Sequence, residues 1–244
     1  MMLLETRGMS KSFGGVDAVR NVDFQLPEGQ IRAIIGPNGA GKSTFVSLIS
    51  GRIPETSGSL TFMGEDITPL PNWKRANRGI VYTFQITSIY AELSCFDNVA
   101  LAVQRRLMSR WTDLFALNRT LLHETTEWAL AQVGLSDSRD KLAGNLSYGY
   151  QRLLEVAIGL ALNPKLLILD EPTQGLAEEE IASFCDLIRT ISKHTTILLI
   201  EHNMEVVMSL AERITVMDKG SVIAEGTPAE IERDDATQRA YLGK

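Results

Sequence analysis

A short glycine-rich segment contains the first residues that could do chemistry. Residues 36–43 read GPNGAGKS, between an apolar stretch and a segment of helical composition. Glycines let backbone N–H groups approach a phosphate, and a helix start adds positive potential. In the pattern GxxxxGK[ST], the lysine contacts the β- and γ-phosphates and the hydroxyl ligates Mg²⁺. We therefore predict a nucleoside triphosphate site in which Lys42 binds phosphate and Ser43 holds the metal, rather than a glycine-rich turn before an ordinary helix.

Two carboxylates follow a second apolar stretch. Residues 166–169 are Leu-Leu-Ile-Leu, and Asp170 and Glu171 come next. Open α/β sheets bind ligands at the carboxyl ends of their strands. Asp170 could complete the Mg²⁺ shell there, and Glu171 could polarise an attacking water. Acids in this position also cap helices, but the phosphate-binding segment in the same chain favours the catalytic interpretation.

A histidine follows a third apolar stretch. His202 comes directly after TTILLIE, at the expected end of a strand. A histidine there can hydrogen-bond a γ-phosphate and sense its loss, or it can be an ordinary cap or surface residue. Its position alone leaves both alternatives open.

The elements around these residues predict the α/β fold class. The apolar stretches at 166–169 and 195–200 flank a helical pattern, which is the order of a parallel β-α-β unit. Apolar residues in that helix recur at spacings of three and four, which predicts a stripe that faces the sheet. The stripe comprises Ile181, Phe184, Ile188 and Ile191.

The first third of the chain predicts further strands, and the middle predicts helices. The expected strands are 16–26, 30–35, Ser57–Phe62 and the apolar end of 75–84, and we expect them to form one N-terminal layer. A helix should begin at Lys42. From about 86 to 145 the pattern becomes helical, which predicts a separate lobe.

Composition excludes several classes of protein. The chain has 244 residues, of which 44% are hydrophobic and 22% charged, with a formal net charge of −6. This balance argues against disorder and against a global positive field that would attract nucleic acid. No apolar stretch has the 18 or so residues of a spanning helix, and the start of the chain lacks a secretory signal, so we expect a cytoplasmic location. Cys95 and Cys185 predict no disulfide framework, and Cys185 should be a buried thiol.

The segment LSYGYQ at residues 146–151 resembles the LSGGQ signature of ATP-binding-cassette ATPases. The resemblance covers essentially the whole chain. It implies a RecA-like P-loop NTPase core formed by 1–85 and 164–244, with an N-terminal antiparallel β layer and an inserted α-helical subdomain at about 86–163. It also implies a head-to-tail dimer, homomeric or heteromeric, that encloses two ATP molecules.

The same resemblance implies roles for individual residues. Expected nucleotide contacts are Phe13, Val19, Gly36, Pro37, Asn38, Gly39, Ala40, Gly41, Lys42, Ser43 and Thr44 in one chain, and Ser147, Gly149 and Gln151 from the other. Phe13 would stack on adenine with Val19 beside it. Expected catalytic residues are Glu171, His202 and Gln85, and expected Mg²⁺ ligands are Ser43, Gln85 and Asp170.

Three positions depart from the family pattern. Tyr148 and Tyr150 replace the third and fifth residues of the signature, and Ala177 stands where the family commonly has aspartate. Because Ser147 and Gly149 remain, binding to the second chain's nucleotide should survive. Without an aspartate at position 177, it is in question whether the loop that contains Ala177 couples the two nucleotide sites as it does in the family.

Several longer segments resemble ATPase subunits of branched-chain amino-acid importers. They are 79–85, the insertion 104–124, the run 201–231 and the ending RAYLGK. Cassettes for urea import and lipopolysaccharide export share much of this pattern. The resemblance implies transmembrane permeases as partners, a periplasmic substrate-binding protein acting indirectly, and a position on the inner face of the membrane.

Soluble cassette ATPases of translation or DNA repair are the alternative class. The translation type has two cassettes in one chain, whereas these 244 residues hold one. The repair type inserts a long coiled coil between its glutamine and its signature, whereas only 62 positions separate Gln85 from Ser147 in this chain. The acidic composition also argues against nucleic acid. The arginines of 104–119 are the feature that most favours nucleic-acid binding, but a solvated helix face or a permease contact explains them more simply.

Overall fold

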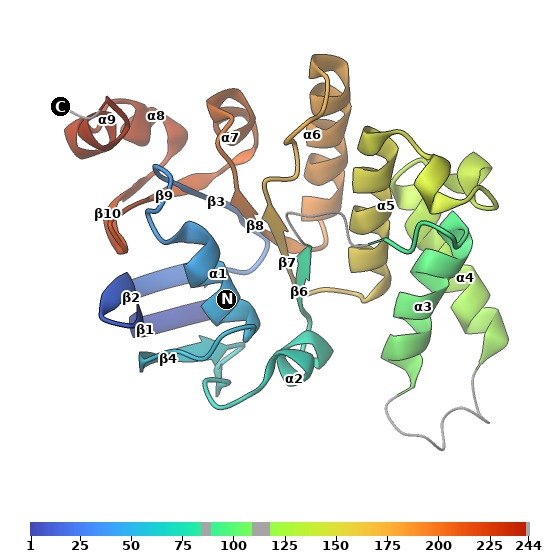
Figure 1. Ribbon diagram of the computed structural model, residues 1–244, viewed down its shortest axis with the longest axis horizontal. Coiled ribbons are helices and arrows are strands. Elements are labelled where there is room, and N and C mark those ends of the chain that lie inside the picture. Colours follow the sequence, from blue (N-terminus) through green and yellow to red (C-terminus); the bar gives the residue numbers. More distant parts are fainter. Residues whose placement is uncertain (84–88, 109–117, 243–244) are drawn as a thin grey trace.

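The computed structural model describes residues 1–83, 89–108 and 118–242, which form two β-sheets with helices around them (Figure 1). The fold class is α/β, as predicted. The two sheets lie in the half of the molecule that contains both termini, and a group of helices makes up the other side (Figure 1). The phosphate-binding segment and the two carboxylates lie on the larger sheet, so this sheet positions the chemistry.

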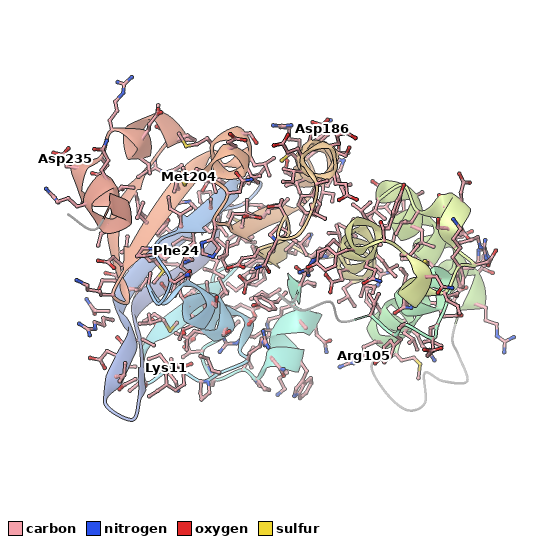
Figure 2. All side chains as sticks on the ribbon, turned by 45° about the horizontal axis from the view of Figure 1, so that its top comes forward. Lys11, Phe24, Arg105, Asp186, Met204 and Asp235 are labelled. Atoms are coloured by element: carbon pink, nitrogen blue, oxygen red, sulfur yellow. The ribbon has the colours of Figure 1, made fainter. Side chains whose placement is uncertain are left out.

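The smaller sheet is antiparallel, with strand order β2-β1-β4-β5. Its strands are β1 (Met2–Phe13), β2 (Val16–Pro27), β4 (Ser57–Phe62) and β5 (Glu65–Asp66). The turn between β1 and β2 consists of Gly14 and Gly15, whose φ values of 54° and 91° suit a tight hairpin. Phe24 on β2 points into the core, where its ring meets that of Phe45 edge to face at 5.5 Å (Figure 2). An antiparallel N-terminal layer is therefore confirmed.

The larger sheet has the strand order β10-β9-β3-β8-β7-β6. Its strands are β3 (Ile31–Ile35), β6 (Ile80–Thr83), β7 (Leu166–Asp170), β8 (Thr196–Ile200), β9 (Arg213–Asp218) and β10 (Ser221–Gly226). All neighbours are parallel except β9 and β10. The prediction that 30–35 and the end of 75–84 belong to the N-terminal layer is wrong. Both segments join the larger sheet, where every residue of β3, β7 and β8 is buried and most of these residues are apolar.

Helices cover this sheet on both sides. They are α1 (Lys42–Ser50), α2 (Asn72–Asn77), α6 (Glu178–Ser192), α7 (Met204–Leu210), α8 (Pro228–Glu232) and α9 (Asp235–Leu242). The predicted stripe of α6 faces the core, because Phe184, Ile188 and Ile191 are buried with Leu167 of β7. The helix predicted from Lys42 begins there, and Cys185 is buried as expected.

The described residues in the middle of the chain are mainly helical, as predicted. It contains α3 (Cys95–Leu107), α4 (Arg119–Gln132) and α5 (Tyr148–Ala161), with short 3₁₀ turns at Ser136–Ser138 and Ala143–Asn145. α5 packs between the other two helices and the sheet (Figure 1), and Arg105 of α3 is exposed (Figure 2). One core cluster runs from α3 and α4 through α5 to β7. Across the described part of the chain, no helix has the length and apolar character to cross a membrane.

Candidate active site

Three predicted groups of site residues meet at one edge of the larger sheet. The phosphate-binding loop follows β3, Asp170 and Glu171 lie at the end of β7, and His202 follows β8. Because β3, β8 and β7 are adjacent and parallel, their carboxyl ends share this edge. The topology therefore brings a cation-bearing loop and two carboxylates together.

Neighbouring backbone fixes the path of the phosphate-binding loop. A Cβ on Gly36 would lie 2.1 Å from the carbonyl oxygen of Met217 on β9. A Cβ on Gly41 would lie 2.3 Å from the carbonyl oxygen of Ala18 on β2. Both glycines also have positive φ, at 150° and 98°. Only glycine fits at these two positions, so the loop is held by both sheets.

Lys42 is buried inside the loop that precedes it. Its side chain is at the start of α1 and the residue is only 5% exposed. The ammonium donates hydrogen bonds to the carbonyl oxygens of Gly36 (2.7 Å) and Pro37 (3.1 Å). Burial lowers the pKa of Lys42, and the nearby Glu171 and Asp170 oppose this shift. Ser43, the next residue, is exposed on the first turn of α1.

Asp170 presents two carboxylate oxygens with different surroundings. The residue is buried, and its Oδ2 accepts a hydrogen bond of 2.6 Å from the hydroxyl of Tyr82 on β6. Its Oδ1 is buried without a hydrogen-bond partner among the described residues. Burial raises the pKa of Asp170, while the Tyr82 bond lowers it. A carboxylate oxygen in this state suits a cation.

Glu171 and His202 form a pair across the ends of β7 and β8. The Nε2 atom of His202 hydrogen-bonds the Oε1 atom of Glu171. Glu171 has a left-handed backbone, with φ at 50°, and its N–H donates to the carbonyl of Ile200 at 2.9 Å. A non-glycine residue in this region is uncommon and is held by the surrounding structure. The imidazole thus fixes the orientation of the carboxylate.

Glu201 is a site residue that the sequence analysis missed. It is 3% exposed and lies directly after β8. Its Oε1 accepts the N–H of Thr173 at 3.0 Å and also the hydroxyl of that residue. Its Oε2 accepts the N–H groups of His202 at 2.9 Å and Asn203 at 3.3 Å. Glu201 therefore ties the loop after β7 to the loop after β8. An acid that ends a buried strand beside a predicted site is the signal that could have revealed it.

The signature residues lie at the start of α5, facing α6. A Cβ on Gly149 would lie 2.5 Å from the Oε1 atom of Glu180, so a side chain here would require the Glu180 carboxylate to move. Tyr148, one of the departures from the family pattern, lies against Gly175, and its hydroxyl accepts a 2.6 Å hydrogen bond from Arg152. The amide of Gln151 donates to a carbonyl in the loop before its own helix rather than facing outward.

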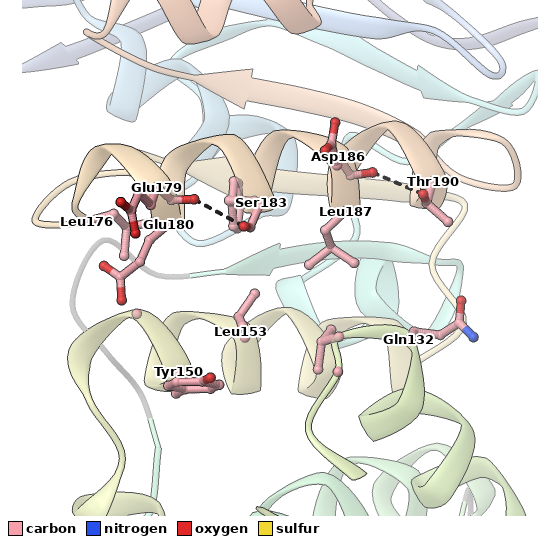
Figure 3. A pocket seen from close by; sticks show the side chains of 14 residues that line it. Gln132, Tyr150, Leu153, Leu176, Glu179, Glu180, Ser183, Asp186, Leu187 and Thr190 are labelled. Carbon is pink, nitrogen blue, oxygen red and sulfur yellow. Dashed lines mark hydrogen bonds between the residues drawn. The ribbon is translucent and has the colours of Figure 1, made fainter. Parts of the chain in front are cut away.

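A groove of about 570 Å³ separates α5 from α6 near the signature. Figure 3 shows Tyr150 and Leu153 of α5 on one side and Glu179 and Glu180 of α6 on the other. The groove lies beside the signature and not at the phosphate-binding loop, whose residues do not line it.

The two residues expected at the adenine differ in exposure. Phe13, at the end of β1, is 49% exposed, and the ammonium of Lys11 lies 5.0 Å from the centre of its ring. Val19 is 1% exposed and belongs to the core between the smaller sheet and α1, and its contact with adenine stays a prediction. The alternation of β2 turns Val19 inward. Gln85, the remaining expected site residue, lies outside the described residues.

The fold and this sheet edge define a P-loop ATPase of the cassette type, and comparison with known proteins gives the family. The chain belongs to the ABC transporter family, whose sequence profile matches residues 19–174. It binds nucleotide and is an ATPase.

Relatives that align with nearly the whole chain indicate which kinds of transport ATPase it resembles. The chain is 38% identical to the high-affinity branched-chain amino acid transport ATP-binding protein LivG of Salmonella typhimurium, over 99% of this chain and 98% of that protein. It is 32% identical to the lipopolysaccharide export system ATP-binding protein LptB of Escherichia coli, over 100% of this chain and 98% of that protein. A solved ATP-binding cassette of an ABC transporter, in its ADP conformation, aligns over all of both chains with a TM-score of 0.88 and 29% identity.

Proposed function

We propose that this chain is the ATP-hydrolysing subunit of a membrane importer for branched-chain amino acids. The convergence of Lys42, Asp170 and the Glu171–His202 pair on one sheet edge is the observation that carries the ATPase part of the proposal. The similarity to LivG over nearly the whole length of both chains supports the transport part.

Phosphate binding falls to the loop and to the start of α1. The residues from Gly36 to Thr44 supply N–H groups, a helix N-terminus and the Lys42 ammonium. Lys42 would give up its bonds to the carbonyls of Gly36 and Pro37 in favour of phosphate oxygens. Phe13, which is half exposed at the end of β1, would stack on the adenine.

A magnesium ion fits the donors at this edge. Asp170 has a buried oxygen without a hydrogen-bond partner in the described part of the chain, and Ser43 presents an exposed hydroxyl. Carboxylate and hydroxyl oxygens are the donors that this cation prefers. We infer that Asp170, Ser43 and Gln85 hold it. When bound, Mg²⁺ neutralises charge that develops on the phosphate oxygens.

Hydrolysis is assigned to Glu171 with the help of His202. The carboxylate of Glu171 would accept a proton from the attacking water. The bond from His202 restricts the rotation of that carboxylate, which keeps its acceptor oxygens in a fixed direction. Glu201 holds the backbone on both sides of the pair, so it supports the same geometry.

A second cassette, identical or different, would complete each site. Ser147 and Gly149 would present a hydroxyl and a backbone N–H to the γ-phosphate bound by the other chain. Closure of the two cassettes would move transmembrane permease subunits, to which this chain would bind from the cytoplasmic face. A periplasmic binding protein would deliver the amino acid to those permeases.

Reconstitution tests this function directly. The chain, co-expressed with its neighbouring membrane subunits and placed in proteoliposomes with the cognate binding protein, should drive leucine uptake that needs ATP and Mg²⁺. Glu171→Gln should abolish uptake without loss of assembly. Magnesium-dependent ATP hydrolysis without amino-acid uptake would refute the substrate, and absence of hydrolysis in the assembled complex would refute the function.

Lipopolysaccharide export is the second candidate, because LptB is 32% identical over nearly the whole of both chains. The higher identity to LivG favours the importer. Co-purification separates the two functions. Importer permeases should come with the tagged chain, whereas recovery of lipopolysaccharide export subunits would replace the importer assignment.

A further inference from the structure

Tyr82 contacts the carboxylate of Asp170 from the adjacent strand. β6 and β7 are parallel neighbours, and Tyr82 pairs with Ile168, two residues before Asp170. From there the phenol reaches the end of β7, where its hydroxyl donates to Oδ2 at 2.6 Å. The guanidinium of Arg52, just after α1, lies 4.9 Å from the centre of the tyrosine ring. The ring is therefore held from a second element.

This contact makes the two oxygens of Asp170 unequal. Oδ2 is engaged by the phenol, and Oδ1 is buried without a partner among the residues that the structure describes. A carboxylate that rotates freely could offer either oxygen to a cation. With one oxygen fixed by a hydrogen bond, both the direction and the identity of the remaining donor are defined.

We propose that Tyr82 is a positioning residue for the metal site, whose hydroxyl holds Oδ2 of Asp170 so that Oδ1 serves the cation. The proposal rests on the function proposed above, in which Asp170 holds Mg²⁺. Tyr82 acts through Asp170 and contacts neither metal nor nucleotide in this scheme. Loss of an outer-shell partner of a metal ligand typically weakens metal affinity roughly 10- to 100-fold.

Tyr82→Phe separates this role from simple packing. Tyr82 also packs against the core cluster beneath the smaller sheet, and phenylalanine keeps the ring and that contact. The measurement is the affinity for a non-hydrolysable ATP analogue, titrated once with excess Mg²⁺ and once with EDTA. The ratio of the two affinities reports how strongly metal and nucleotide binding are coupled.

We expect Tyr82→Phe to lower this ratio roughly 10-fold and to leave the affinity in EDTA unchanged. Tyr90→Phe is the matched control, because Tyr90 is 64% exposed and remote from Asp170 in sequence and contacts. Asp170→Asn should abolish the coupling. In the double variant Tyr82→Phe/Asp170→Asn, the first change should add nothing, because it acts only through Asp170.

The outcomes distinguish the two proposals. If Asp170→Asn loses the coupling and Tyr82→Phe keeps the wild-type ratio, the positioning role is wrong and the metal site stands. If both variants keep the wild-type ratio, Asp170 does not hold the metal, and the metal site of the proposed function fails with it. A further loss in the double variant would also overturn the positioning role, since Tyr82 would then act by another route.

Discussion

Replacing Glu201 with glutamine should break a connection between two loops of the active site. The Glu201 carboxylate accepts hydrogen bonds from the backbone of Thr173 on one side and of His202 and Asn203 on the other. A glutamine of the same shape has one acceptor oxygen, so it can satisfy only one side. If its amide group faces Thr173, the hydroxyl there can accept instead, but the buried N–H of that residue loses its acceptor.

The size of the effect follows from this single lost bond. A hydrogen bond to a charged group is worth about 1.5–3 kcal/mol. Removing the buried charge of Glu201 offsets part of this loss, so we expect a net decrease of about 2 kcal/mol in the free energy of unfolding. For a chain of this length, that corresponds to a decrease in Tm of roughly 4–8 °C.

Urea denaturation and thermal melting measure the change, with Glu205→Gln as control. Glu205 is exposed on the first turn of α7, four residues further on, and its variant should stay within about 0.5 kcal/mol of the wild type. ATPase activity of Glu201→Gln should also fall, because Glu201 holds the backbone next to Glu171 and at His202. Equal stability of the two variants would refute the idea that Glu201 holds the two loops together.

Three further predictions concern the phosphate site. Lys42→Ala should weaken ATP binding by about 1.5–3 kcal/mol, measured by titration calorimetry, and unchanged affinity would contradict the assignment. Glu171→Gln should bind ATP normally but stop phosphate release, since an amide accepts no proton from water; wild-type turnover would assign the base elsewhere. Gly36→Ala should abolish nucleotide binding because its Cβ would meet the Met217 carbonyl, whereas Gly39→Ala, with open space around it, should cost only about 1 kcal/mol in stability. Equal nucleotide affinity of these two glycine variants would contradict the steric argument.

The predictable part of the site lies where sequence patterns are local. The glycine-lysine segment, the acids after one buried strand and the histidine after another were all found from spacing and composition. Their meeting at one edge followed from the rule that parallel strands end together. The structure confirms that Lys42, Asp170, Glu171 and His202 share that edge, while their catalytic roles stay predictions.

The rest depends on which strands are neighbours. The apolar run of β3 fits either sheet, and only its pairing with β8 and β9 assigns it to the larger one. Tyr82 becomes a partner of Asp170 because β6 lies beside β7, a pairing across more than 80 positions that no local pattern contains. The burial of Val19 also depends on the fold, because the weak alternation of β2 does not reveal which of its faces is buried.

The position of the Lys42 ammonium has a consequence for the release of product. Two carbonyls of its own loop already accept its hydrogen bonds, so this chain contains an internal competitor for the same cation. When a phosphate arrives, the ammonium exchanges acceptors, and binding gains only the difference between them. When the phosphate leaves, the carbonyls of Gly36 and Pro37 can take the ammonium back, and no buried charge is left without an acceptor. The loop therefore limits how tightly it holds what it binds, which favours repeated turnover over permanent capture.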